Sequence, residues 1–138
     1  YEAGTQNFAS AATLKPAIEL LNILNDNNLE EYNNSIKDYL LNILINDERI
    51  RLYGVPRGTS EEKIPLFSFT VKGIHHEDLA LILDKMGIAV RSGQMCAEPL
   101  MDRFGVTGML RISLAPYNTM QEAEYFVKCL NKAIDMLI

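Results

Sequence analysis

Leu66-Phe67-Ser68-Phe69-Thr70-Val71 is the clearest strand in this chain, and the predicted fold is built outward from it. Aromatic and β-branched residues dominate it, as is typical of strands, and Gly73 ends the segment. Residues 49–53 alternate polar and apolar side chains before Gly54 and predict a second strand. Residues 88–91 and 110–114 predict two more, so the sequence indicates a small sheet of four short strands.

Apolar residues at helical spacing predict helices before, between and after these strands in the sequence, over residues 8–24, 29–45, 76–86 and 120–137. Pro16 should kink the first helix or begin a new one, because proline lacks an N–H and clashes with the preceding turn. Asp26-Asn27-Asn28 is a predicted capping cluster, and Thr119 with Glu122 predicts a capping box. Residues 1–7 are a polar lead-in. The order of elements predicts one α/β domain over residues 1–138, of the α+β two-layer kind, with helices packed on a small mixed or antiparallel sheet.

Composition limits the kinds of function open to this protein. The chain has 138 residues, 48% of them hydrophobic, which is enough for one domain with its own core. Its formal net charge of -5 argues against a nucleic-acid or anionic-membrane partner, and no apolar run approaches the roughly 20 residues of a membrane span. The two cysteines are too few for a disulfide framework and fit a reducing cytoplasm. The chain begins at Tyr1 without an initiator Met, so we expect a piece of a longer protein.

The most informative segment for function is Arg91-Ser92-Gly93-Gln94-Met95-Cys96-Ala97-Glu98-Pro99. A thiol reacts as its thiolate and needs an accessible, polar or electropositive setting, which this arginine-containing and turn-forming stretch supplies. Small and turn-forming residues predict a loop, where catalytic groups often lie. A buried, inert Cys96 is the alternative interpretation, and the nonapeptide alone does not choose between the two.

Two arginines accompany this thiol. Arg91 lies where a predicted strand meets the loop, and Arg111 lies on a neighbouring strand. The guanidinium group matches a carboxylate bidentately, so the pair could hold an anionic substrate. Structural ion pairs are the alternative for each arginine taken singly.

Other candidate residues carry less information. Cys129 shares a helical face with apolar residues and is predicted to be buried and inert. His75 and His76 precede a helix, and adjacent histidines in regular structure cannot both point into one site. With no further ligand at a suitable spacing, we predict no metal site. Gly4 and Thr5 could bind phosphate through backbone amides and a hydroxyl, but the dipeptide is common.

Five motifs occur in order along the chain: EAGT at 2–5, GIHH at 73–76, GIAVRSG at 87–93, CAEPLM at 96–101 and LRISLAPYNT at 110–119. Together they resemble the C-terminal part of the Suf-type cysteine desulfurases and selenocysteine lyases. These enzymes belong to the class V aminotransferase group and depend on pyridoxal phosphate. The resemblance covers essentially the whole chain and implies the small C-terminal domain of a fold type I enzyme.

The resemblance implies a role for each matching residue. Cys96 corresponds to the catalytic cysteine, which takes sulfur from L-cysteine as a persulfide, releases alanine and passes the sulfur to an acceptor protein for iron–sulfur cluster assembly. Arg111 corresponds to the arginine that binds the substrate carboxylate, and Arg91 lines the same site. Gly4 and Thr5 correspond to a segment that reaches the cofactor phosphate of the other subunit in a homodimer.

Two departures qualify this correspondence. Many relatives carry a His-His pair before the cysteine, where this chain has Gln94-Met95, and this removes one source of a proton or thiolate partner. The family's Schiff-base lysine, in a Ser-x-His-Lys context, does not occur in this sequence. We therefore expect these residues to bind no pyridoxal phosphate stably and to be inactive alone. A selenocysteine lyase, another cysteine lyase or epimerase relative, and a non-catalytic interaction domain are the alternatives.

Overall fold

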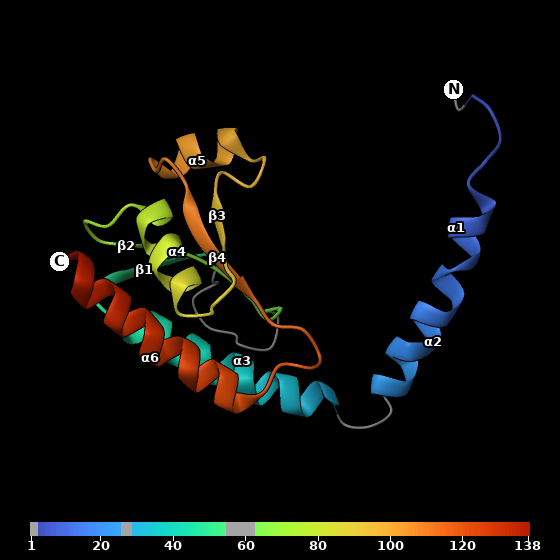
Figure 1. Cartoon of the computed structure of the whole chain (residues 1–138), viewed down its shortest axis with the longest axis horizontal. Coiled ribbons are helices and arrows are strands. Elements are labelled where there is room, and N and C mark those ends of the chain that lie inside the picture. Colours follow the sequence, from blue (N-terminus) through green and yellow to red (C-terminus); the bar gives the residue numbers. More distant parts are fainter. Residues whose placement is uncertain (1–2, 26–28, 55–62) are drawn as a thin grey trace. The chain divides into compact units, whose positions relative to one another are not determined.

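A computed structural model describes residues 3–25, 29–54 and 63–138 of the chain (Figure 1). The chain divides into two compact units, residues 1–32 and residues 33–138, and each is described by itself. The predicted capping cluster at residues 26–28 and most of the predicted loop at residues 57–63 lie outside the described residues.

The first unit consists of an irregular lead-in and two helices, α1 (Phe8–Ala12) and α2 (Leu14–Asn25). Asn7 caps α1 by accepting a hydrogen bond from the backbone N–H of Ser10, and Thr13 separates the two helices. Pro16 lies in the first turn of α2, where its missing N–H costs no helical hydrogen bond. The prediction that this proline accompanies the start of a new helix is therefore confirmed.

The second unit is built on a four-stranded sheet in the order β1-β2-β4-β3. Its strands are β1 (Ile50–Tyr53), β2 (Leu66–Val71), β3 (Arg91–Gly93) and β4 (Met109–Ser113), and every neighbouring pair is antiparallel. The helices are α3 (Leu29–Asn46), whose first four residues belong to the first unit, α4 (His76–Lys85), α5 (Glu98–Phe104) and α6 (Met120–Leu137). The predicted α+β class, with helices on a small antiparallel sheet, is confirmed.

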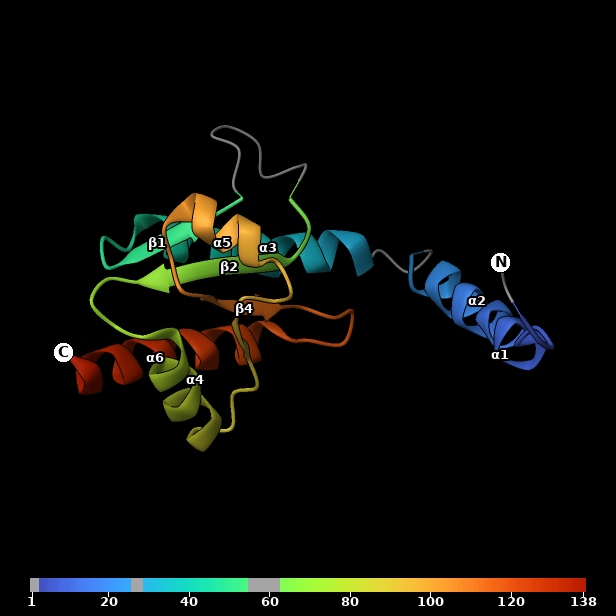
Figure 2. The same cartoon turned by 90° about the horizontal axis from the view of Figure 1, so that it is seen from above.

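The main core lies between one face of the sheet and the helices α3, α4 and α6. Phe67, Phe69 and Val71 alternate inward along β2, and every second residue of β2 is buried as period-2 strand geometry requires. Leu110 and Ile112 of β4 add to this face, and the helices contribute the other buried side chains, among them Leu40 and Leu83. Figures 1 and 2 place α5 on the other side of the sheet from α3 and α6.

A second, smaller core fixes α5 to that other face. Tyr53, Met101 and Met109 are buried together, with Phe104 and Val106 packed against them. The rings of Tyr53 and Phe104 lie 5.0 Å apart between centroids and are tilted by 54°, a favourable aromatic arrangement. This cluster joins β1, α5 and β4.

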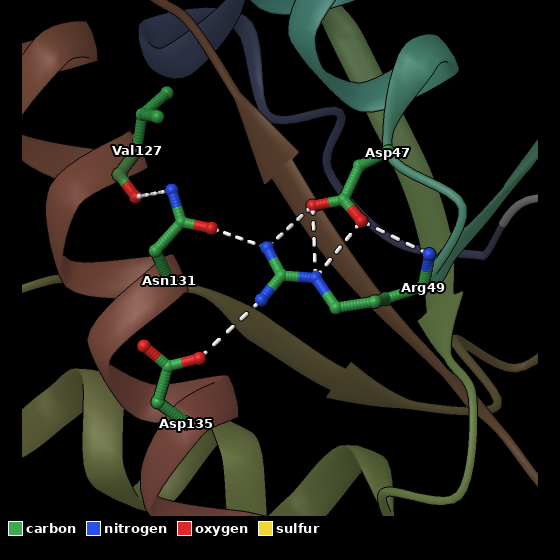
Figure 3. A network of polar contacts seen from close by, with 5 residues as sticks. All are labelled: Asp47, Arg49, Val127, Asn131 and Asp135. Carbon is green, nitrogen blue, oxygen red and sulfur yellow. Dashed lines mark hydrogen bonds and ion pairs between the residues drawn. The ribbon is translucent and has the colours of Figure 1, made fainter.

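A polar network on Arg49 joins the start of β1 to α6 (Figure 3). Its guanidinium donates hydrogen bonds to both carboxylate oxygens of Asp47, at 2.7 to 3.2 Å, and to the amide oxygen of Asn131. An ion pair to Asp135 at 3.4 Å and the hydrogen bond from Asn131 to the carbonyl oxygen of Val127 complete it. The strand begins at Ile50, one residue later than predicted, although the carbonyl oxygen of Arg49 still accepts a hydrogen bond from the backbone N–H of Lys72 at 2.8 Å.

Two further differences from the sequence prediction concern the segment around Cys96. Residues 88–90 form no strand; Ile88 and Val90 pack against the main core, and pairing with β4 begins only at Arg91. Residues 98–104, for which no helix was predicted, form α5, which has Pro99 in its first turn and ends at Gly105 in a left-handed conformation (φ 68°). The predicted capping box of Thr119 and Glu122 is confirmed.

Candidate functional site

The sheet register places four polar or aromatic residues in one row on the α5 side. Tyr53 pairs with Ser68, Ser68 with Arg111, and Arg111 with Arg91, so the row crosses all four strands. Tyr53 belongs to the small core with α5, whereas Leu110 and Ile112, the neighbours of Arg111, belong to the main core on the opposite face. Both arginines therefore lie on the face that α5 partly covers.

Arg91 and Arg111 are direct cross-strand neighbours. Side chains opposite each other in antiparallel strands lie about 5 Å apart at Cβ, and like charges there are destabilising. Within the described part of the chain, neither guanidinium donates a hydrogen bond or forms an ion pair. Two adjacent guanidinium groups, one exposed and one half-buried, form a site suited to an anion such as a carboxylate.

The loop that carries Cys96 has an unusual backbone. The amide of Ala97 donates to the carbonyl oxygen of Gln94 at 3.0 Å, closing a tight turn whose central residues are Met95 and Cys96. Both have positive φ, 56° and 60°, which L-residues adopt at a cost of roughly 1–2 kcal/mol each. Backbone strain of this kind is concentrated at functional sites, where the surrounding structure holds it in place.

The turn is held at both ends. Gly93, the last residue of β3, pairs with Met109, and Ala97 precedes α5, whose Met101 is buried in the small core. Cys96 itself is exposed. The fold therefore presents an accessible thiol on a strained turn at the edge of the sheet that carries the two arginines.

The remaining predicted residues occupy less central places. Cys129 is buried in the main core, as predicted. Gly4 and Thr5 lie in the lead-in of the first unit, and the positive φ of Gly4 (88°) requires a residue tolerant of that conformation. Their role as a phosphate site stays a prediction.

The two histidines lie side by side at the start of α4. The ring centroids of His75 and His76 are 4.3 Å apart. Only His76 is helical, whereas His75 is the extended N-cap of α4 and accepts a hydrogen bond from the N–H of Glu77. Among the residues that the structure describes, no group of three or more His, Cys, Asp or Glu side chains is arranged to hold a metal ion.

Sequence reasoning missed a contact behind the thiol loop. Nδ1 of His76 lies 2.7 Å from Oγ of Ser92 on β3, and the imidazole packs directly on Gly108. The prediction assigned His76 only to the start of a helix; the GIHH and RSG motifs carried no sign that they meet.

Comparison with known proteins identifies one family over most of the chain. Residues 1–126 match the family model of aminotransferase class-V. A probable cysteine desulfurase of Vibrio cholerae is 38% identical over 137 residues, and the cysteine desulfurase CsdA of Escherichia coli is 34% identical over 137 residues. Each alignment covers 99% of this chain and 33% of the relative, so the chain spans about a third of the length of the curated relatives it matches.

Solved structures agree in fold. A crystal structure of the Escherichia coli CsdA with an S-sulfonic acid superposes with a TM-score of 0.81 at 34% identity, and it is matched over 99% of this chain and 33% of its own. An apo cysteine desulfurase from Thermococcus onnurineus gives the same TM-score at 32% identity and the same coverage. In the described part of this chain, no helix is long and apolar enough to cross a membrane. On the match of residues 1–126, the chain belongs to the aminotransferase class-V family.

Proposed function

We propose that this chain is the C-terminal part of a pyridoxal-phosphate-dependent cysteine desulfurase. The reaction converts L-cysteine to L-alanine and leaves the sulfur as a persulfide on Cys96, for delivery to an acceptor protein that serves iron–sulfur cluster assembly. The observation that carries the proposal is the exposed thiol on a strained turn, which follows the strand of Arg91; Arg91 and its neighbour Arg111 form no ion pair with any described residue. The names of the two relatives, both cysteine desulfurases, support it.

Arg111 is the proposed carboxylate-binding residue. It is half-buried on an inner strand, so its guanidinium is held more firmly than that of Arg91 on the edge strand. A half-buried guanidinium fork binds the α-carboxylate of an amino acid through two parallel hydrogen bonds. Arg91 adds positive charge beside it and helps to neutralise the same anion.

Cys96 is the proposed sulfur acceptor. Its thiolate forms an S–S bond to the substrate sulfur while the bond from that sulfur to Cβ breaks. The electron pair of the broken bond stays on carbon, which is protonated and leaves as alanine. Covalent catalysis of this kind separates desulfuration from the later transfer of sulfur to the acceptor.

The cofactor has no complete site in these residues. The row on the α5 face consists of Tyr53, Ser68, Arg111 and Arg91, so it offers no amine for the cofactor aldehyde. When bound in the full-length protein, pyridoxal phosphate would supply the electron sink of the reaction. Gly4 and Thr5 are the proposed contribution of this chain, at the cofactor phosphate of the second subunit in a homodimer. The two free cysteines are consistent with a cytoplasmic protein.

The test is a Cys96→Ala variant of the full-length protein, with Cys129→Ala as the matched control because that thiol is buried. Cys96→Ala is expected to keep the colour of the bound cofactor and to lose sulfide release from cysteine in the presence of a reductant. Cys129→Ala is expected to keep both. Unchanged sulfide release by Cys96→Ala would refute the assignment.

A further inference from the structure

The strand that precedes the Cys96 turn is the shortest strand of the sheet. β3 has three residues, lies at the edge and, among the described strands, pairs only with β4. Its pairing also brings Arg91 against Arg111, which opposes the contact. Something beyond the strand ladder must hold β3, because both Arg91 and the Cys96 turn depend on its position.

In addition to the packing of Ile88 and Val90 against the main core just before β3, His76 makes two contacts that can do this. From the first turn of α4, its Nδ1 lies 2.7 Å from the hydroxyl oxygen of Ser92, the middle residue of β3. The same ring rests on the backbone of Gly108, so closely that a Cβ there would lie 2.8 Å from Cε1 and 2.9 Å from Cδ2. Gly108 is buried and immediately precedes β4.

The register shows why these two contacts matter together. Ser92 pairs with Leu110 and Gly93 with Met109; continuing this register sets Gly108 opposite Gln94, the first residue of the Cys96 turn. The imidazole therefore lies behind the point at which the chain leaves β3 for the turn. It holds that point from the main-core side, whereas α5 holds the turn from the other face.

The chemistry of the ring suits this role. Burial lowers the pKa of His76, and the neighbouring His75 lowers it further, so the imidazole is neutral at pH 7. A neutral ring at Nδ1 forms one hydrogen bond with a hydroxyl and adds no third positive charge near the two arginines.

We propose that His76 is a positioning residue, which holds β3 and the Cys96 turn in place through its hydrogen bond to Ser92 and the packing of its ring on Gly108. This role requires no contact of His76 with substrate or thiol. This inference rests on the proposed desulfurase function for its kinetic consequence, but its structural consequence is independent of that function.

The experiment compares Ser92→Ala with Ser92→Thr in the full-length protein, with Ser113→Ala on β4 as a serine control. Ser92→Ala removes the partner of Nδ1, whereas threonine keeps the hydroxyl and favours a strand. We expect Ser92→Ala to lower kcat for cysteine about fivefold, the value of one hydrogen bond, with KM unchanged because Arg111 stays on β4. Ser92→Thr and Ser113→Ala should stay close to the wild-type kcat. His76→Asn, which keeps a polar group near the position of Nδ1, should retain more kcat than His76→Ala.

A second readout needs no catalysis. Amide hydrogen exchange at residues 92–94 and the rate of Cys96 alkylation should both change in Ser92→Ala and return to wild-type values in Ser92→Thr. Equal behaviour of the alanine and threonine variants, or unchanged exchange in Ser92→Ala, would overturn the proposal. If Cys96→Ala keeps desulfuration while exchange follows this pattern, the proposed function fails and the positioning role stands.

Discussion

Removing either member of the arginine pair should make the domain more stable, in contrast to most substitutions of half-buried residues. Arg91 and Arg111 are cross-strand neighbours without an anionic partner in the described part of the chain. At a separation of about 5 Å in water, two unit charges repel by roughly 0.8 kcal/mol. Long side chains with partly exposed charges are free to move those charges further apart than the Cβ atoms, so we expect Arg111→Gln and Arg91→Gln each to raise the free energy of unfolding by about 0.5 kcal/mol at low salt, within the range of cross-strand pairs.

The assay is urea unfolding of the single variants, the double variant and an Arg103→Gln control, whose exposed arginine lies on α5. The free energy of unfolding of the double variant should exceed that of the wild type by no more than that of one single variant does, because the first substitution already removes the repulsion. Salt should erase the gain, since a Debye length of about 10 Å at 0.1 M screens exposed charges. If both single variants are less stable than wild type and their effects add, the arginines make structural contacts and the anion site is refuted.

Two further predictions concern the turn and the Arg49 network. Met95→Gly removes the strain of a left-handed backbone, and this gain exceeds the cost of the larger backbone entropy that glycine has in the unfolded chain. The free energy of unfolding, measured by urea titration, should therefore rise by about 0.5–1 kcal/mol. A lower free energy of unfolding would mean that the φ of 56° carries no strain. Hydrogen bonds from Arg49 hold the pKa of Asp47 below its usual 3.8, so its contribution to stability is complete above that pH and is lost as the pH falls through the lower folded value. Asp47→Asn should therefore lose less stability than the wild type on acidification, measured as Tm in a pH series of thermal melts. The same fall of Tm with decreasing pH in both proteins would contradict this.

Local patterns were sufficient for much of this fold. The alternation in β2 and the capping box at Thr119 and Glu122 depend on residues close in sequence, so both were predicted correctly. The helix α5 was missed because it has seven residues, no side-chain N-cap and a proline, which together resemble a loop. Its stability comes from Met101 in a core shared with Tyr53, a contact that no local pattern records.

The candidate site likewise has parts that local sequence patterns predicted and parts that depend on the tertiary fold. The motif around Cys96 indicated a reactive thiol, and strand prediction set Arg91 and Arg111 on neighbouring strands. Their direct pairing depends on register, which is fixed by packing of the whole sheet. The contact between His76 and Ser92 joins residues 16 positions apart on different elements, so it became visible only in the structure.

The most direct test of the central claim is mass spectrometry of the Cys96 peptide after the full-length protein has reacted with L-cysteine in the absence of reductant. We predict that this peptide gains the mass of one sulfur atom, that the Cys129 peptide does not, and that alanine is released in equal amount. An unmodified Cys96 peptide in protein that still releases alanine would contradict the account.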